Sequence, residues 1–169
     1  VWPHLYSDWT HYLVTGADNA LEEHYRKLCE HITAYQQLII IAYDSAHQQH
    51  IQRQCHAIAE DKRVIFMIKT NDTWVRDFGP QYFAQQGLDL QFNGWGNQYP
   101  CSLDAAFAEN LHRQLLTQHA TTMAAHTIQH LRATQRALEG GNLEFNGSGV
   151  LLFNYRCIAN NNPTLNLSV

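Results

Sequence analysis

The fold of this chain is organised around the stretch NDTWVRDFGP, residues 71–80. It follows an apolar run, residues 64–69, which predicts a buried strand. The Gly-Pro pair that closes the stretch indicates a turn or loop exit. Binding and catalytic groups are commonly mounted on loops that a rigid scaffold holds in this way. The polar residues of the stretch are therefore the first candidates for a functional site.

Two carboxylates in this stretch suit a planar cation. Ionised Asp72 and Asp77 only accept hydrogen bonds, and a guanidinium presents several N–H donors in one plane. Trp74 could supply a flat wall for such a cation. The alternative is that Arg76 pairs with one of the carboxylates and braces the loop, because structural ion-pair networks also resemble sites.

Length and composition predict one globular domain with a sizeable core, since the chain has 169 residues, 45% of them hydrophobic and 15% charged. The net charge of −4 argues against a nucleic-acid partner, for which a basic patch is expected. No apolar run approaches the ~18 residues of a membrane span, so we expect no membrane partner.

The cysteines and histidines predict no disulfide and no metal site. Four scattered thiols fit a reducing compartment, which indicates a cytoplasmic location; they are Cys29, Cys55, Cys101 and Cys157. Among the eleven histidines, His47 and His50 could share a helix face, with His56 further on. No Cys or carboxylate completes a recognisable ligand set, so we expect a solvated face, no metal and no cofactor.

Periodicity predicts an α/β chain with mixed strand directions. We expect helices over residues 18–34, 45–59 and 104–118, with Ser102 as N-cap of the third. Strands are expected over residues 37–43 and 64–69. Two hairpins are expected, residues 81–92 turning at 85–87 and residues 137–153 turning at Asn146-Gly147. Residues 119–134 favour neither helix nor strand.

Four stretches, in one order along the chain, resemble the agmatine deiminase and bacterial peptidylarginine deiminase family. Residues 74–80 are similar to its W-x-R-D-x-G-P signature, and residues 92–100 to its F-N-x-W-G-x-x-Y-P segment. Trp2-Pro3-His4 with Asp8-Trp9 resembles W-P-H…D-W, and residues 138–149 resemble L-E-G-G-[SN]…G-x-G. One such match would be weak evidence, but four in order identify the chain as a member of this family.

The resemblance implies a propeller of ββαβ modules around a central active site. Residues 1–169 would form a single partial deiminase domain, roughly the N-terminal half of the propeller, with the C-terminal half absent. The implied activity is hydrolysis of a guanidino group through a Cys thiouronium intermediate. The implied substrate is agmatine, giving N-carbamoylputrescine and ammonia in polyamine metabolism, or arginine residues, giving citrulline. A homodimer is one possible assembly.

The matching motifs also imply roles for particular residues. Asp77 matches the Asp that grips the substrate, and Glu139 matches the Glu that orients the catalytic His, so both are predicted as catalytic residues with side chains in one shared cavity. Asp72, Trp74 and Asn142 join Asp77 as candidate substrate-binding residues. The alternatives are core packing for Trp74 and loop capping for Asn142. The remaining residues of these motifs are expected to be backbone devices or packing residues; they are Gly140, Gly141, Trp95 and Tyr99.

The family's His-x-Asp motif and nucleophilic Cys have no match in residues 1–169. Cys101 is the one thiol worth testing as a nucleophile, but no His lies in a matching motif, so we expect this chain alone to be inactive. An amidinotransferase or dimethylarginine hydrolase of the same superfamily is an alternative, although the W-P-H and F-N-x-W-G segments favour a deiminase. A non-catalytic guanidinium-binding module is a second alternative.

Overall fold

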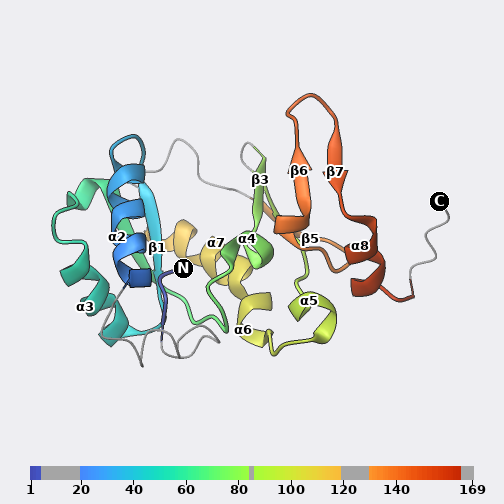
Figure 1. The fold of residues 1–169 in the computed structure, drawn as a ribbon, viewed down its shortest axis with the longest axis horizontal. Coiled ribbons are helices and arrows are strands. Elements are labelled where there is room, and N and C mark those ends of the chain that lie inside the picture. Colours follow the sequence, from blue (N-terminus) through green and yellow to red (C-terminus); the bar gives the residue numbers. More distant parts are fainter. Residues whose placement is uncertain (5–19, 84–85, 119–129, 165–169) are drawn as a thin grey trace. The chain divides into compact units, whose positions relative to one another are not determined.

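The computed structural model describes residues 1–4, 20–83, 86–118 and 130–164 (Figure 1). The chain divides into two compact units, unit 1 (residues 1–73) and unit 2 (residues 74–169). Both units combine helices and strands, so the predicted mixed α/β class is confirmed. In the described part of the chain, no helix has the length and apolarity needed to cross a membrane.

Unit 1 is a two-stranded parallel sheet with helices packed on it. Strands β1 and β2 pair in parallel with Ile40 opposite Ile65. Helix α2 contacts β1, and α3 contacts both strands. The elements are α2 (Ala20–Thr33), β1 (Leu38–Ala42), α3 (Ser45–Gln54), the 3₁₀ helix η1 (Glu60–Lys62) and β2 (Arg63–Met67).

Buried side chains from both helices and from β1 form the core of unit 1. The cluster consists of Trp2, Cys29, Ile40, Ala42, Ile51, Cys55 and Ile58. Helix α3 is shorter than the predicted 45–59, because the chain turns after Gln54. The turn is closed by the N–H of Ile58, which donates to the carbonyl of Cys55 at 2.9 Å. This turn places the Ile58 side chain in the core of unit 1.

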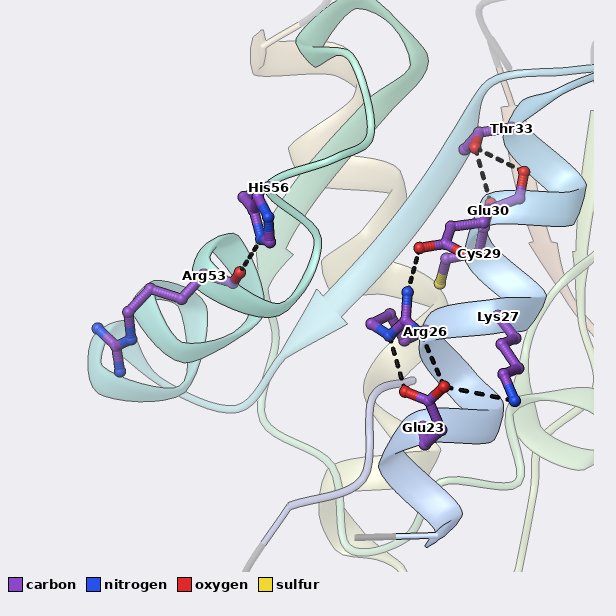
Figure 2. A network of polar contacts seen from close by, with 8 residues as sticks. All are labelled: Glu23, Arg26, Lys27, Cys29, Glu30, Thr33, Arg53 and His56. Carbon is purple, nitrogen blue, oxygen red and sulfur yellow. Dashed lines mark hydrogen bonds and ion pairs between the residues drawn. The ribbon is translucent and has the colours of Figure 1, made fainter.

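One face of α2 carries charges at helical spacing (Figure 2). The Arg26 guanidinium lies between Glu23 and Glu30 and pairs with both, and Lys27 pairs with Glu23. The hydrogen bonds from Arg26 lower the pKa of Glu23 to about 2. Solvent screens exposed pairs of this kind, so we interpret this face as weak local support for α2 and not as a site.

Unit 2 holds a three-stranded sheet, a separate hairpin and several short helices. Strand β4 pairs antiparallel with β3 and parallel with β5, and β6 pairs antiparallel with β7. The strands are β3 (Gln81–Phe83), β4 (Gln86–Asp89), β5 (His130–Ala133), β6 (Leu143–Phe145) and β7 (Leu151–Phe153). The helices are α4 (Val75–Phe78), α5 (Gly94–Asn97), α6 (Ser102–Ala105), α7 (Phe107–Gln118), η3 (Gly140–Asn142) and α8 (Tyr155–Asn161).

Both predicted hairpins exist, but their limits were partly wrong. Gln86 and Gly87 belong to β4, opposite Phe83 and Tyr82, and not to the turn. In the second hairpin the first strand is β6, residues 143–145, which is shorter than predicted because residues 140–142 form η3. Its turn spans residues 146–150, where the Asn146 side chain accepts hydrogen bonds from the N–H groups of Ser148 and Val150.

The third predicted helix is divided in two. Helix α6 ends at Ala105 and α7 begins at Phe107. Ser102 is the first residue of α6 and not its N-cap; Cys101 holds that position without a capping hydrogen bond from its side chain. Phe107, the first residue of α7, is buried, and its ring meets Phe78 edge-on at 5.2 Å between centroids.

Candidate functional site

Asp77 lies in the single-turn helix α4, which a buried aromatic residue anchors. The neighbouring Phe78 is 1% exposed and packs against Phe92 and Phe107. Backbone hydrogen bonds from Asp77 to Trp74 and from Gly79 to Val75 close the turn. The core of unit 2 therefore fixes the backbone from which the Asp77 carboxylate projects.

The Asp77 carboxylate has a specific donor and a close backbone neighbour. The indole Nε1–H of Trp95 donates to its Oδ2 at 3.1 Å. The other oxygen, Oδ1, lies so close to Gly141 that an added Cβ there would stand 2.1 Å from it. Gly141 therefore serves close approach, as predicted for the E-G-G motif, and bounds one side of the carboxylate.

Arg76 does not form an ion pair with the Asp77 carboxylate. Its guanidinium donates to the Leu143 carbonyl at 3.2 Å and to Gln81 at 3.4 Å, and it pairs with Glu144 at 3.5 Å. The interpretation of Arg76 as a brace for the Asp77 carboxylate was wrong. Asp77 keeps acceptor capacity for a cation, because a carboxylate offers about four lone-pair positions.

Glu139 is a buried carboxylate held by an amide. It is 9% exposed, and its Oε1 accepts from Nδ2 of Asn161 at 2.7 Å. The residue after it, Gly140, packs against the Arg76 carbonyl so closely that a Cβ would stand 2.2 Å away. The segment after Glu139 therefore lies directly on the turn that carries Asp77. A cavity shared by the two carboxylates stays a prediction.

The Asn142 side chain has a structural role. It donates to the Asn154 carbonyl at 3.3 Å and accepts from the Asn154 N–H at 2.8 Å. Asn154 in turn caps α8. These bonds tie η3 to the start of α8, in agreement with the loop-capping alternative. Substrate contact by Asn142 stays a prediction.

The two remaining candidates differ in exposure. Asp72, in unit 1, is 7% exposed and accepts from the Thr73 N–H at 2.6 Å. Burial raises the pKa of Tyr25, whose hydroxyl hydrogen bonds to Thr73 beside this carboxylate. Trp74, in unit 2, is 46% exposed, which contradicts the core-packing alternative. Roles of Asp72 and Trp74 in substrate binding stay predictions.

The loop at residues 93–97 carries Trp95, which donates a hydrogen bond to Asp77 and which the sequence analysis assigned to packing. Its backbone is left-handed at four successive residues, with φ of 68° at Gly94, 55° at Trp95, 78° at Gly96 and 64° at Asn97. The Asn93 side chain accepts from the Gly96 N–H at 3.0 Å and closes the turn. The run FNGWGN was visible in the sequence, but the direction of the indole N–H was not.

The described cysteines are all free, as predicted. Cys29 and Cys55 are buried in the core of unit 1. The pKa of Cys29 is raised, chiefly by a hydrogen bond between the two thiols and secondly by burial. Burial, and then the nearby Asp104, raise the pKa of Cys101. A raised pKa removes thiolate, so Cys101 lacks the activation that a nucleophile needs.

Within the described ranges, no cluster of His, Cys, Asp and Glu could hold a metal ion.

Comparison with known proteins identifies the family. Residues 1–168 match the model of the Porphyromonas-type peptidyl-arginine deiminase family. The chain belongs to this family. A protein of Selenomonas ruminantium, provisionally named an agmatine deiminase, is 27% identical over 177 aligned positions, covering 98% of this chain and 43% of that protein.

Solved structures of deiminases agree with this membership. A substrate-bound agmatine deiminase of C. jejuni superposes with a TM-score of 0.77 at 29% identity, covering 98% of this chain and 45% of that one. A provisionally named arginine deiminase of Porphyromonas gingivalis gives 0.75 at 26% identity, covering 97% and 46%. This deiminase-family chain therefore spans less than half the length of the relatives it matches.

Proposed function

We propose that the natural protein containing this chain is a hydrolase that deiminates a guanidino group, with agmatine as substrate. The proposal depends chiefly on the hydrogen-bond environment of the Asp77 carboxylate. Its carboxylate is oriented by the Trp95 indole, while Arg76 is engaged by Leu143, Gln81 and Glu144. Among the described residues, no cation pairs with the Asp77 carboxylate, and an oriented carboxylate of this kind suits a guanidinium ligand.

Each carboxylate has a distinct role in this proposal. Asp77 grips the guanidinium nitrogens and holds the central carbon for attack, which supplies catalysis by orientation. Glu139 orients the histidine that moves protons, and Asn161 keeps its carboxylate in place. Trp74 and Asn142 contact the substrate, and Asp72 is a further candidate for substrate contact. Both units of the chain would belong to one domain, the N-terminal half of an α/β propeller.

The reaction proceeds in two balanced steps. A cysteine thiolate outside this chain attacks the guanidinium carbon, a C–S bond forms, and the C–N bond breaks as protonated nitrogen leaves as ammonia. Water then adds to the same carbon, the C–S bond breaks, and the ureido product leaves with regeneration of the thiol. The His-x-Asp pair that transfers these protons also lies outside the chain.

Agmatine is favoured over arginine residues because agmatine deiminases recur among the similar proteins, one of them solved with its substrate bound. The test is an assay of the natural polypeptide with agmatine, an arginine-containing peptide and dimethylarginine. Ammonia and product mass are measured together. We expect ammonia and N-carbamoylputrescine from agmatine at the highest kcat/KM. Ammonia release from the peptide alone would show that the substrate is an arginine residue and not agmatine. Binding of agmatine without any turnover would show that the protein is a guanidinium-binding module and not an enzyme.

A further inference from the structure

We propose that Trp95 is a positioning residue for Asp77, and that the loop of residues 93–97 holds both candidate carboxylates of the site. The proposal deepens the proposed function, because it takes Asp77 as the guanidinium ligand. It rests on contacts within unit 2, where one loop connects to Asp77 through Trp95 and to Glu139 through Asn161.

The Trp95 ring is fixed by aromatic residues. Phe92 meets it edge-on with centroids 4.9 Å apart and an interplanar angle of 89°. Tyr99 meets it at 5.7 Å and 90°. An indole held by two perpendicular rings has little freedom to turn, so its N–H keeps one direction. That direction points to Oδ2 of Asp77.

The Asp77 carboxylate is thereby bounded at both oxygens. Oδ2 accepts the indole N–H, and Oδ1 lies against Gly141. A charge-assisted hydrogen bond favours one rotamer of the carboxylate, and the close glycine backbone limits movement to the other side. The remaining lone pairs then present a constant arrangement to a planar ligand, which bidentate binding of a guanidinium requires.

The same loop supports Glu139 through two further contacts. Asn93 uses its oxygen to close the turn at Gly96 and its Nδ2 to donate to the Asn161 carbonyl at 3.1 Å. A Cβ on Gly96 would stand 3.2 Å from Oδ1 of Asn161, so loop and side chain are in close contact. The Asn161 amide nitrogen donates to Glu139. Asn93 therefore couples the turn that carries Trp95 to the residue that holds Glu139.

The loop conformation is itself informative. A large aromatic residue rarely adopts a left-handed backbone, and Trp95 does so with φ of 55°. Such strained residues persist where the surroundings over-determine them, and they concentrate at functional sites. Here the strained backbone is what turns the indole N–H towards Asp77.

The first test needs no ligand. Trp95→Phe keeps an aromatic ring at this position and removes the N–H donor together with part of the indole. Trp2→Phe is the matched control, because the Trp2 indole donates to Glu22 at 2.8 Å in unit 1. In crystal structures of the natural polypeptide, we expect Trp95→Phe to leave the Asp77 carboxylate in more than one rotamer and Trp2→Phe to leave it single. An unchanged Asp77 rotamer in Trp95→Phe would overturn the positioning role.

The second test is a double-mutant cycle on agmatine turnover. Trp95→Phe should lower kcat/KM about tenfold in the wild-type background, the scale of one hydrogen bond to a charged group. In an Asp77→Asn background it should lower kcat/KM less than about twofold, since the N–H acts through Asp77. Equal losses in both backgrounds would show a merely structural role and contradict the proposal. If the wild type does not act on agmatine, the proposed function fails, and the rotamer comparison still decides the role of Trp95.

Discussion

Trp95 and Asp77 lie 18 residues apart in the sequence and are joined by a hydrogen bond of 3.1 Å from the indole N–H to the carboxylate. The contact assigns the acidic residue of the R-D-x-G-P motif a partner in the F-N-x-W-G motif. The two motifs therefore meet at the Asp77 carboxylate, whereas Arg76, the neighbour in sequence, contacts Leu143 and Glu144 of β6.

Gly141→Ala should damage the site without unfolding the chain. The new methyl group would stand 2.1 Å from Asp77 Oδ1, so the carboxylate must rotate away from Trp95. We expect kcat/KM for agmatine to fall at least about tenfold, the cost of a lost charge-assisted hydrogen bond. The control is Gly147→Ala, where a Cβ meets nothing within 4 Å but φ is +73°. It should cost about 1 kcal/mol of stability and leave turnover unchanged. Equal turnover in the two variants would contradict this account of Gly141.

Much of the framework could be predicted from the sequence, because it depends on local periodicity. The apolar run at β1 and the helical spacing of apolar residues in α2 are local signals that do not depend on the rest of the chain. Asp77 and Glu139 were identified through resemblance of their motifs, and their roles stay predictions.

The features that could not be predicted depend on non-local contacts. The direction of the Trp95 indole follows from a left-handed loop packed between Phe92 and Tyr99. The contact of Asn161 with Glu139 joins residues 22 apart through the unpredicted helix α8. Neither contact leaves a periodic signal, so sequence reasoning placed Trp95 with the packing residues and gave Asn161 no role.

Asn161→Leu should destabilise unit 2 by leaving a buried carboxylate without its donor. Glu139 and Asn161 are 9% and 8% exposed, so water cannot readily replace the lost bond. We expect the free energy of unfolding to fall by about 1–3 kcal/mol, measured by urea denaturation. The exposed neighbour Asn160, replaced by Leu, is the control and should change it by less than about 0.5 kcal/mol. Equal losses from the two substitutions would show that the Glu139 contact is not what stabilises this region.

The stability of unit 1 should depend on pH through His4. Burial, and then the neighbouring His47, lower the pKa of His4 to about 4, although Asp44 acts in the opposite direction. Because this folded-state pKa lies below the unfolded value of about 6.5, the unfolded chain binds more protons between these values. The contribution is complete above pH 6.5 and is lost as pH falls towards 4, by about 2 kcal/mol after allowance for screening.

The check is urea denaturation of the wild type and of His4→Gln at several pH values from 7.5 to 4.5. Glutamine cannot titrate but can still bond the Thr70 hydroxyl, which lies 2.9 Å from the His4 ring. We expect a shallower loss of stability in His4→Gln than in the wild type, and the wild-type slope in the exposed control His56→Gln. Parallel pH profiles for the wild type and His4→Gln would refute the assignment.

Ammonia release from agmatine by Asp77→Asn is the most direct test of the proposed guanidinium site. The substitution is nearly isosteric, but the amide directs an N–H donor where the substrate also presents donors. The natural polypeptide is assayed beside Asp89→Asn, which alters a buried carboxylate of the same unit that accepts from the Gln91 N–H at 3.2 Å. Turnover by Asp77→Asn should fall on the order of 10²–10³-fold, the scale of one preorganised electrostatic contact. Asp89→Asn should retain the wild-type turnover per folded molecule, with folding followed by thermal unfolding. Near wild-type turnover by folded Asp77→Asn would contradict the assignment of Asp77 as the guanidinium ligand.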